Sequence, residues 1–194
     1  MGIFKKDEFR PDKPRSGFMS KLFLTQKQRQ ALIKWGLYAL VLLVLSIVQD
    51  VLLSRWRLSG ITTELVPCGI FLICLAEGLE RGSVFSLIAA CAYLFSGSAA
   101  GNHVIIFITV ISVFVTFFRQ AYLRKGFGAT VLCASVAMVM YEVAIFLIAL
   151  FLGMTIWDRF LSHLLAAGFT LLSVPMLYPV VNGISAIGGD AWKE

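Results

Sequence analysis

The sequence predicts an all-α integral membrane protein with six transmembrane helices, on the evidence of its composition, its apolar runs and its charge distribution. Apolar residues make up 59% of the 194 residues and charged residues only 14%, with a mean hydropathy of +0.86. A soluble domain carries about 25% charged residues. Because a membrane helix needs about 20 apolar residues, the chain has room for roughly six spans. The composition excludes a disordered chain, a soluble enzyme with one dry core and a disulfide-stapled secreted module.

Residues 1–30 are predicted to form a basic cytosolic tail that ends in a short interfacial helix. The tail holds eight basic and three acidic residues, a net charge of +5. The segment FMSKLFL at 18–24 gathers its apolar side chains on one helical face, which suits a helix that lies in the lipid interface. We expect Lys21, Lys27 and Arg29 to contact anionic headgroups, at about 1 kcal/mol per residue near the surface. This placement favours anionic lipid over nucleic acid as the partner of the basic charge.

Residues 31–185 contain six apolar runs, which we interpret as one membrane bundle, followed by a cytosolic tail at 186–194. The runs cover residues 35–53, 65–79, 84–100, 104–118, 129–152 and 160–181. The middle runs, of about 15 residues, rise only about 22 Å as helix, which is less than the hydrocarbon thickness. If the third and fourth runs formed a re-entrant hairpin, the chain would have four spans. Pro175 and Pro179 are expected to bend the last turns of the sixth run.

The distribution of Lys and Arg predicts that both termini lie in the cytosol. With six spans, fourteen basic residues fall on the side of the termini, and only Arg55, Arg57 and Arg159 fall on the opposite side. Basic residues accumulate in cytoplasmic segments. The same side is expected if the third and fourth runs are re-entrant.

Glu142 and Tyr141 lie near the middle of the fifth run and are the deepest candidates for a functional site. An ionisable residue at this depth costs about 2.5 to 3.5 kcal/mol on insertion scales, so it needs a partner or a purpose. Three roles remain open for Glu142: a structural hydrogen bond within the bundle, a partner or substrate site, and a proton relay.

Two further polar groups lie near the ends of the runs. Asp50 and Glu64 bracket the first external loop, where interfacial anchoring or a binding role would each explain them. The turn from Ser96 through Gly97 to Gly101 is interpreted as a close-packing turn, with a substrate-lining break as the alternative.

Catalytic motifs are absent from the sequence, and we expect no catalytic residue, metal or cofactor. Neither HExxH nor GxSxG occurs, and no glycine-rich phosphate loop follows a strand. The best enzymatic alternative is an intramembrane serine protease of the rhomboid kind, with Ser98 and His163 as the reacting pair. That family's Gly-x-Ser-Gly motif is missing, because Ala99 follows Ser98.

The order of these features over residues 36–182 resembles the rod shape-determining protein MreD family. A first span that ends in Leu-Ser-Arg is followed by the run at 60–65, where that family has Gly-Ile-x-Pro-Asp-Leu. The turn at 94–101 matches its Leu-Leu-Ser-Gly-x-x-x-Gly pattern, a basic loop follows the fourth span, and the Tyr141-Glu142 pair lies in the fifth. Two positions depart from the family pattern: Thr63-Glu64 replaces Pro-Asp, and Tyr93 replaces an acidic residue.

The resemblance implies a non-enzymatic scaffold of the bacterial cell-elongation complex in the inner membrane. The family acts with the bitopic protein MreC, the SEDS glycosyltransferase RodA and a class B penicillin-binding transpeptidase, and it is linked indirectly to the MreB filament. Its fold is similar to the six-helix S component of ECF vitamin transporters. The alternative is therefore a vitamin-binding S component, but the docking motif Ala-x-x-x-Ala typical of such subunits is missing between Ala31 and Leu53.

Overall fold

The computed structural model describes residues 26–52, 63–123 and 126–187, and within these ranges the chain is helical and contains no strand. The α-helices are α1 (Gln26–Ile47), α2 (Leu65–Glu77), α3 (Leu79–Phe95), α4 (His103–Tyr122), α5 (Phe127–Phe151), α6 (Phe160–Leu171) and α7 (Val174–Ser185). A π-helical turn, η2 (Val48–Leu52), continues α1, and a 3-10 turn, η4 (Trp157–Arg159), precedes α6. The all-α class predicted from composition is confirmed for this part of the chain.

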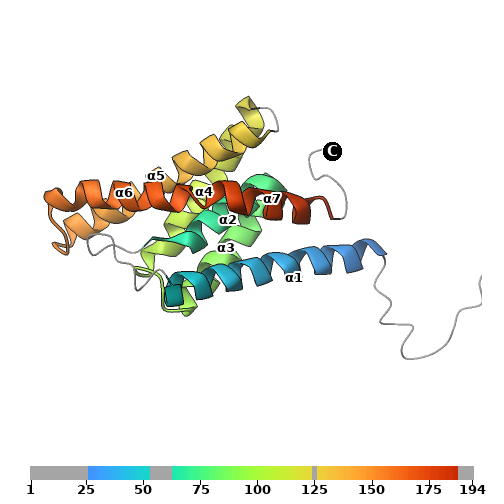
Figure 1. Ribbon diagram of the computed structural model, residues 1–194, viewed down its shortest axis with the longest axis horizontal. Coiled ribbons are helices and arrows are strands. Elements are labelled where there is room, and N and C mark those ends of the chain that lie inside the picture. Colours follow the sequence, from blue (N-terminus) through green and yellow to red (C-terminus); the bar gives the residue numbers. More distant parts are fainter. Residues whose placement is uncertain (1–25, 53–62, 124–125, 188–194) are drawn as a thin grey trace, which may run out of the picture.

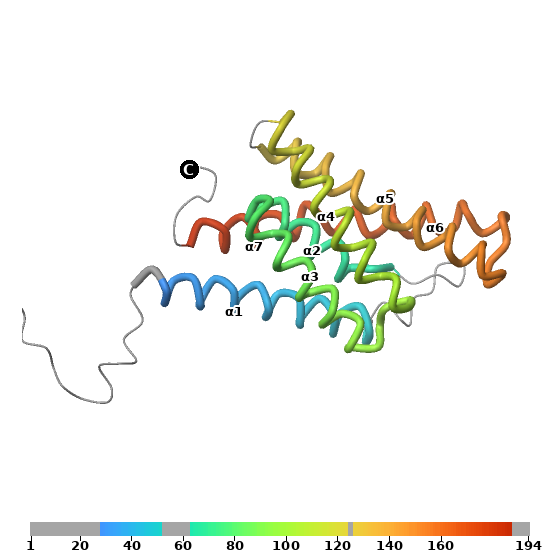
Figure 2. The backbone as a smooth tube through the Cα atoms, turned by 180° about the vertical axis from the view of Figure 1, so that it is seen from behind, coloured from blue at the N-terminus to red at the C-terminus, as the bar shows by residue number. Residues whose placement is uncertain are grey.

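Helix α2 lies at the centre of the bundle and packs against each of the other α-helices (Figures 1 and 2). All its residues except Ala76 are buried. A helix that is apolar on every side is stable only when it is surrounded, and the sequence LVPCGIFLICLAE has such a composition. The fold is therefore organised around a short central helix, which the sequence predicted as one of six spans and as one of the middle runs that are shorter than the hydrocarbon thickness.

Glycines allow the neighbours of α2 to approach closely. A Cβ atom at Gly82 of α3 would lie 2.9 Å from the backbone oxygen of Cys74, and a Cβ atom at Gly69 would lie 2.5 Å from the Leu45 side chain of α1. Gly78, with φ of 86°, makes the sharp turn between α2 and α3. These contacts bring α1 and α3 onto α2.

Three helical segments are long and apolar enough to cross a membrane: Gln28–Val51, His103–Tyr122 and Phe127–Phe151. The pair α6 and α7 adds a fourth if it is counted as one span, because it passes the same test together with a bend of 47°. The 13 residues of α2 and the 17 of α3 are shorter. The membrane-spanning character expected from composition thus holds for three or four segments of the described chain, and six spans stay a prediction.

The sixth apolar run is divided into two helices. Helix α6 ends at Leu171 and α7 begins at Val174, so the bend lies before Pro175 and not in the last turns as expected. Proline disfavours helical geometry in the residue that precedes it and lacks the backbone N–H that would bond to the previous turn. Pro175 is therefore tolerated in the first turn of α7, and Pro179 is accommodated inside it.

The start of α1 and the end of α7 lie at the same end of the bundle; the helices from α1 to α5 alternate in direction, and α6 and α7 together run back as one bent pair (Figures 1 and 2). Arg29 is exposed on the first turns of α1. The predicted interfacial helix at 18–24, with Lys21, lies outside the described residues, as do the side chain of Lys27 and most of the predicted 186–194 tail. The lipid contacts and the cytosolic placement of the termini stay predictions.

Candidate functional site

A buried ion pair joins α1 to the end of α2. Lys34 Nζ lies 2.7 Å from Glu77 Oε1, and the Tyr38 hydroxyl donates a 2.6 Å hydrogen bond to the same oxygen. Lys34 and Tyr38 are one turn apart on α1, so both reach Glu77 from the same helical face. The sequence interpretation counted Lys34 only as a charge that reports topology. Its spacing to Tyr38 is the signal that could have suggested a shared buried partner.

A second polar group joins the start of α2 to η2 and α3. The Gln49 side chain accepts a 3.0 Å hydrogen bond from the backbone N–H of Val66 and donates a 3.1 Å bond to the Tyr93 hydroxyl. The first N–H groups of a helix have no partner within the helix, so Gln49 supplies one for α2. Neither Gln49 nor Tyr93 was predicted as a site residue, because an amide or a phenol in an apolar run carries no motif.

The turn after α3 is closed by Asp50. Ser98 Oγ donates to the Asp50 carboxylate at 2.8 Å, and Ser96 Oγ donates to the backbone oxygen of Tyr93 at 2.7 Å. Gly97 adopts a φ of 77°, which glycine reaches without strain. Asp50, Ser96 and Gly97 therefore meet in one turn, and their hydrogen bonds support the interpretation of a close-packing turn.

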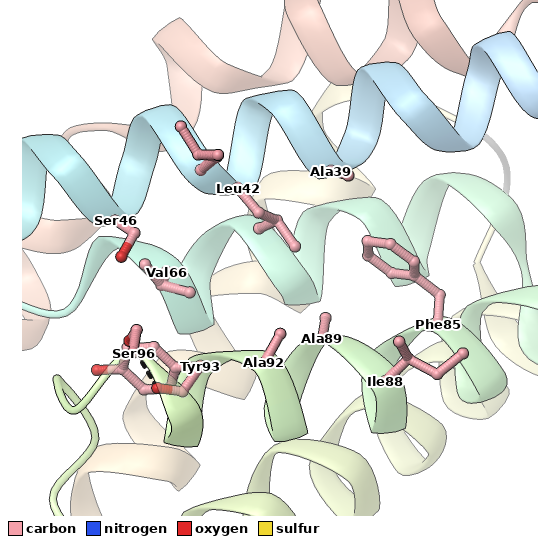
Figure 3. Close-up of a pocket in the computed structure, with 11 residues that line it drawn as sticks. Ala39, Leu42, Ser46, Val66, Phe85, Ile88, Ala89, Ala92, Tyr93 and Ser96 are labelled. Carbon is pink, nitrogen blue, oxygen red and sulfur yellow. Dashed lines mark hydrogen bonds between the residues drawn. The ribbon is translucent and has the colours of Figure 1, made fainter.

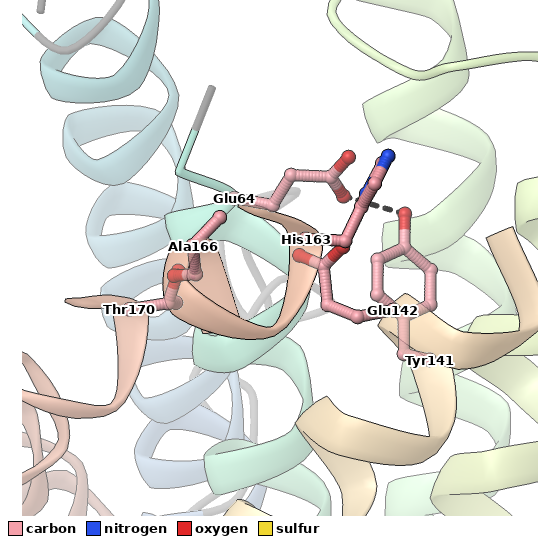
Figure 4. A network of polar contacts seen from close by, with 6 residues as sticks. All are labelled: Glu64, Tyr141, Glu142, His163, Ala166 and Thr170. Atoms are coloured by element: carbon pink, nitrogen blue, oxygen red, sulfur yellow. Dashed lines mark hydrogen bonds and ion pairs between the residues drawn. The ribbon is translucent and has the colours of Figure 1, made fainter. Parts of the chain in front are cut away.

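A third polar group, here called the Glu142 cluster, consists of Glu64, Tyr141, Glu142 and His163 (Figure 4). The Tyr141 hydroxyl donates a 2.6 Å hydrogen bond to Glu64 Oε2, and His163 Nδ1 lies 3.5 Å from Glu142 Oε2. Glu64 precedes α2, Tyr141 and Glu142 belong to α5, and His163 belongs to α6. The cluster thus brings together three predicted site residues and a histidine from a different helix.

The Glu142 carboxylate is only partly satisfied. Its side chain is 5% exposed, and its Oε1 atom is buried without a hydrogen-bond partner. The hydroxyl of Thr63, which precedes Glu64 in the sequence, is also buried and unpaired. A buried polar atom without a partner destabilises the folded state by about 1 to 3 kcal/mol. A proton or a further polar group bound at Glu142 Oε1 would relieve that cost.

An outward-facing groove, here called the α1–α3 groove, runs between those two helices above α2 (Figure 3). Its volume is about 380 Å³. It is lined by Ala39, Leu42, Leu43, Ser46, Val66, Phe85, Ile88, Ala89, Ala92, Tyr93 and Ser96. Three of these residues are alanines, one on α1 and two on α3, and their small side chains leave space between the two helices. The floor of the groove is formed by α2.

Contacts between α1 and α3 close the groove at both ends. At one end the Phe85 ring packs 5.4 Å from Trp35 and 5.9 Å from Tyr38, measured between ring centroids. At the other end lies the hydrogen bond between Gln49 and Tyr93. A further hollow of about 470 Å³ continues past Phe85 toward Glu80 and Arg81. The contacts at the two ends therefore fix the distance between the walls of the groove, which is present without a bound partner.

No known protein family, curated protein or solved structure matches this chain.

The two members of the alternative protease pair have different partners. Ser98 bonds to Asp50 beside α3, whereas His163 lies against Glu142 and stacks edge-on with Phe146 at a centroid distance of 5.4 Å. A nucleophilic serine needs a base within hydrogen-bond reach. The described structure does not bring these two residues together as such a pair.

The described acidic, histidine and cysteine side chains do not gather into a metal centre. Among the described residues, no group of three or more His, Cys, Asp or Glu side chains has a metal-binding arrangement. The carboxylates are instead distributed among separate helix contacts, at Glu77, Asp50 and the Glu142 cluster.

Arg119 of α4 was counted only as a topological charge, and the structure buries it. Its guanidinium donates a hydrogen bond to the backbone oxygen of Leu75 in the last turn of α2. The last carbonyls of a helix lack partners within the helix, so Arg119 stabilises the end of α2 as Gln49 stabilises its start. Polar side chains from neighbouring helices thus hydrogen-bond to the backbone at both ends of the central helix.

Proposed function

We propose that this chain is a non-enzymatic scaffold of the bacterial cell-elongation complex, which binds the membrane helix of an MreC-like bitopic protein in the α1–α3 groove. The observation that carries the proposal is the groove itself, with small residues on facing helices and contacts that hold both ends open. The protein would lie in the inner membrane, and the groove would open toward lipid.

Small residues are what helix association in a membrane requires. Lipid tails are as apolar as leucine, so burial alone does not drive two membrane helices together, and close packing of backbones does. Ala39 on one wall and Ala89 and Ala92 on the other leave room for a neighbour's side chains. A partner helix that lies across the groove would contact α1, α3 and the floor at Val66.

The size of the groove suits bulky apolar side chains. A protein cavity of about 150 Å³ holds a molecule the size of benzene, so a groove of about 380 Å³ takes roughly two such groups. We expect the partner helix to insert two large apolar side chains, such as Phe or Leu, between the alanines. Recognition would then rest on shape, since polar contacts between membrane helices average only about 0.6 kcal/mol.

The centre of the bundle supports a scaffold over the alternative of a vitamin-binding S component. The apolar side chains of α2 from Leu65 to Leu75 are buried and fill the space between the other helices. A vitamin held between the helices would need that space. The polar groups at both ends of α2 are engaged in contacts with neighbouring helices.

The wider assembly follows from the resemblance. Through the MreC-like protein the scaffold would meet RodA, its transpeptidase partner and, indirectly, MreB. The basic tail would hold the cytosolic face on anionic lipid, beginning beside the exposed Arg29.

The test places a photoreactive residue at Ala92 and coexpresses the chain with the MreC-like protein of the same organism. We expect irradiation to link position 92 to the membrane helix of that partner. Ala39→Trp, which fills the groove from its exposed α1 wall, should reduce capture of the partner at least tenfold.

A photoreactive residue at Val110, which is exposed on α4, and the variant Val110→Trp are the matched controls. Neither should change capture of the partner. Equal cross-linking from positions 92 and 110 would reject the groove as the binding site. Copurification with a pair of ATPases or a bound vitamin would support the transporter subunit, and a released peptide product would support the protease.

A further inference from the structure

The Glu142 cluster is not used by the proposed scaffold function, and it places three titratable groups side by side in the interior. Figure 4 shows the side chains of Glu64, Glu142 and His163 directed toward one another, with Tyr141 beside them. Glu142 and His163 are 5% and 17% exposed. The unpartnered Oε1 atom of Glu142 points to an additional ligand in the cluster.

Charge balance identifies that ligand. With both glutamates ionised and the histidine neutral, the cluster would carry a charge of −2, and burying a charge without compensation is costly. Two protons make the cluster neutral, either on both carboxylates or on one carboxylate and the imidazole. A third proton makes it +1.

Other elements near the cluster do not supply a compensating cation. Tyr93 of α3 lies within electrostatic reach of Glu64 and Glu142, and Asp50 of η2 adds a further negative charge beyond Tyr93. Apart from His163, the groups on α5 and α6 that pack here are the Tyr141 phenol and the Phe146 and Phe160 rings. Two basic side chains of the described residues have buried contacts, Lys34 and Arg119. Both contact the last turn of α2, at the end opposite to the cluster.

Helix α6 packs on α5 through small residues and through the Phe146 and Phe160 rings, while its outer face is exposed. Its buried residues are the small side chains Ala166, Ala167 and Thr170, and its large apolar side chains Leu161, Leu165 and Phe169 are exposed. The Thr170 hydroxyl bonds within its own helix, to the Ala166 oxygen at 2.9 Å. The contact of His163 with Glu142 is therefore the polar connection from α6 to α5.

The connection of α6 to α7 permits movement. The two helices meet at a 47° bend around Leu172 and Ser173. Leu172 and Ser173 still bond back to Phe169 and Thr170, but Pro175 has no N–H with which to extend this ladder into α7, so the bend is a point at which the two helices can hinge.

We propose that the Glu142 cluster is a proton-binding site that latches α6 onto α5 and the start of α2. In the latched state the cluster holds two protons taken up from water and is neutral. Loss of a proton to water leaves a buried negative charge, so α6 separates about the bend at Leu172 and water enters to solvate the carboxylates. The site is independent of the α1–α3 groove.

The sign of the pH dependence follows from the charges. Raising the pH removes a proton from the neutral cluster and favours the open state, and strong acidification adds a third proton and also favours it. Latching is therefore greatest at intermediate pH. An opening that releases one proton changes the ratio of open to latched protein by about tenfold per pH unit.

The experiment follows hydrogen–deuterium exchange of the α6 segment 160–171 in the full-length protein in lipid nanodiscs, corrected at each pH for the intrinsic exchange rate. We expect protection of α6 to pass through a maximum and to fall on the alkaline side by up to about tenfold per pH unit. In the double variant Glu64→Gln/Glu142→Gln, which has no carboxylate to ionise, the alkaline fall should disappear.

Glu80→Gln is the matched control, because Glu80 is exposed on α3 and should leave the wild-type curve unchanged. A wild-type curve that does not vary with pH, or a double variant that still loses protection in alkali, would overturn the proposal.

If the double variant does not fold, infrared spectroscopy of the wild type and of Glu142→Gln tests whether a carboxyl group of the cluster is protonated. The wild type should show a protonated-carboxyl band at neutral pH that shifts in D₂O and is diminished in the variant. An unchanged band would also overturn the proposal. Neither measurement involves a partner protein, so the result stands apart from the test of the scaffold function.

Discussion

At the scale of single residues, the polar side chains of this apolar chain connect helices to one another. Lys34 and Tyr38 share Glu77, Gln49 links the start of α2 to Tyr93, and Arg119 serves the last turn of α2. The contacts of Glu77, of Gln49 with Tyr93 and of Arg119 join residues 39 or more positions apart, and the bond of Gln49 to Val66 joins residues 17 positions apart. Buried polar groups that are satisfied in this way specify one arrangement of helices.

Removing the positive partner of Glu77 should destabilise the bundle strongly. Lys34→Met leaves the buried carboxylate with the Tyr38 hydroxyl alone, and breaking one side of a buried ion pair costs about 3 kcal/mol. The double variant Lys34→Met/Glu77→Gln should recover most of that loss, since no charge is left unpaired. Unfolding by SDS titration from detergent micelles measures both.

Arg29→Met is the control, because Arg29 lies two turns or less from Lys34 on the same helix and is exposed. Its effect should stay within about 0.5 kcal/mol. A Lys34→Met protein as stable as Arg29→Met would show that the pair contributes nothing to folding.

At the scale of elements, the fold depends on how closely α1 and α3 approach the buried helix α2. Cys74 donates a 3.1 Å hydrogen bond from its thiol to the backbone oxygen of Gly82, and the absent side chain of Gly82 is what allows α3 to come this near. Both walls of the α1–α3 groove are positioned by these approaches. The groove is therefore a consequence of packing on α2.

Gly82→Ala should loosen the pairing of α2 and α3. The added Cβ atom would lie 2.9 Å from the Cys74 oxygen and 3.0 Å from its Cα atom, and backbone atoms cannot rotate away. Overpacking of this kind costs about 1 to 3 kcal/mol. The loss is measured by the same SDS titration.

Gly128→Ala in α5 is the matched control, since nothing lies within 4 Å of the added Cβ atom. Alanine is the better helix former by about 1 kcal/mol, so this variant should be at least as stable as the wild type. Similar effects of the two substitutions would contradict the close contact at Gly82.

At the scale of the whole molecule, helices α1 to α5 alternate in direction, and the α6–α7 pair returns the chain to the end where α1 began (Figure 1). The short helices α2 and α3 form a hairpin that returns at Gly78 inside this arrangement. The excess of Lys and Arg on one side predicts that both ends of the chain lie in the cytosol, and this orientation stays a prediction.

Reporter fusions test this orientation. A fluorescent protein that folds only in the cytosol, attached at residue 1 or at residue 194, should be fluorescent in both positions. A periplasmic enzyme reporter inserted between residues 53 and 62 should be active, because the positive-inside interpretation places that loop on the opposite side. Fluorescence at one terminus only would contradict the same-side arrangement.

Composition and length alone predict the helical class and the apolar segments, and they single out Glu142 and Tyr141 as the deepest polar candidates, whose role stays a prediction. Composition and length report directly on burial in lipid or protein, and a carboxylate in an apolar run is conspicuous wherever it packs. The close-packing turn at Ser96 and Gly97 was also predictable, because its hydrogen bonds are mostly local.

Which residues meet depends on how the helices pack. The main polar contacts join residues that are 21 or more positions apart: Glu64 with Tyr141, Glu142 with His163, and Lys34 with Glu77. Nearly every face of these helices is apolar, so periodicity does not show which face turns inward. Close approach at glycine and alanine sets those faces, and it is a property of the packed bundle that no single segment carries.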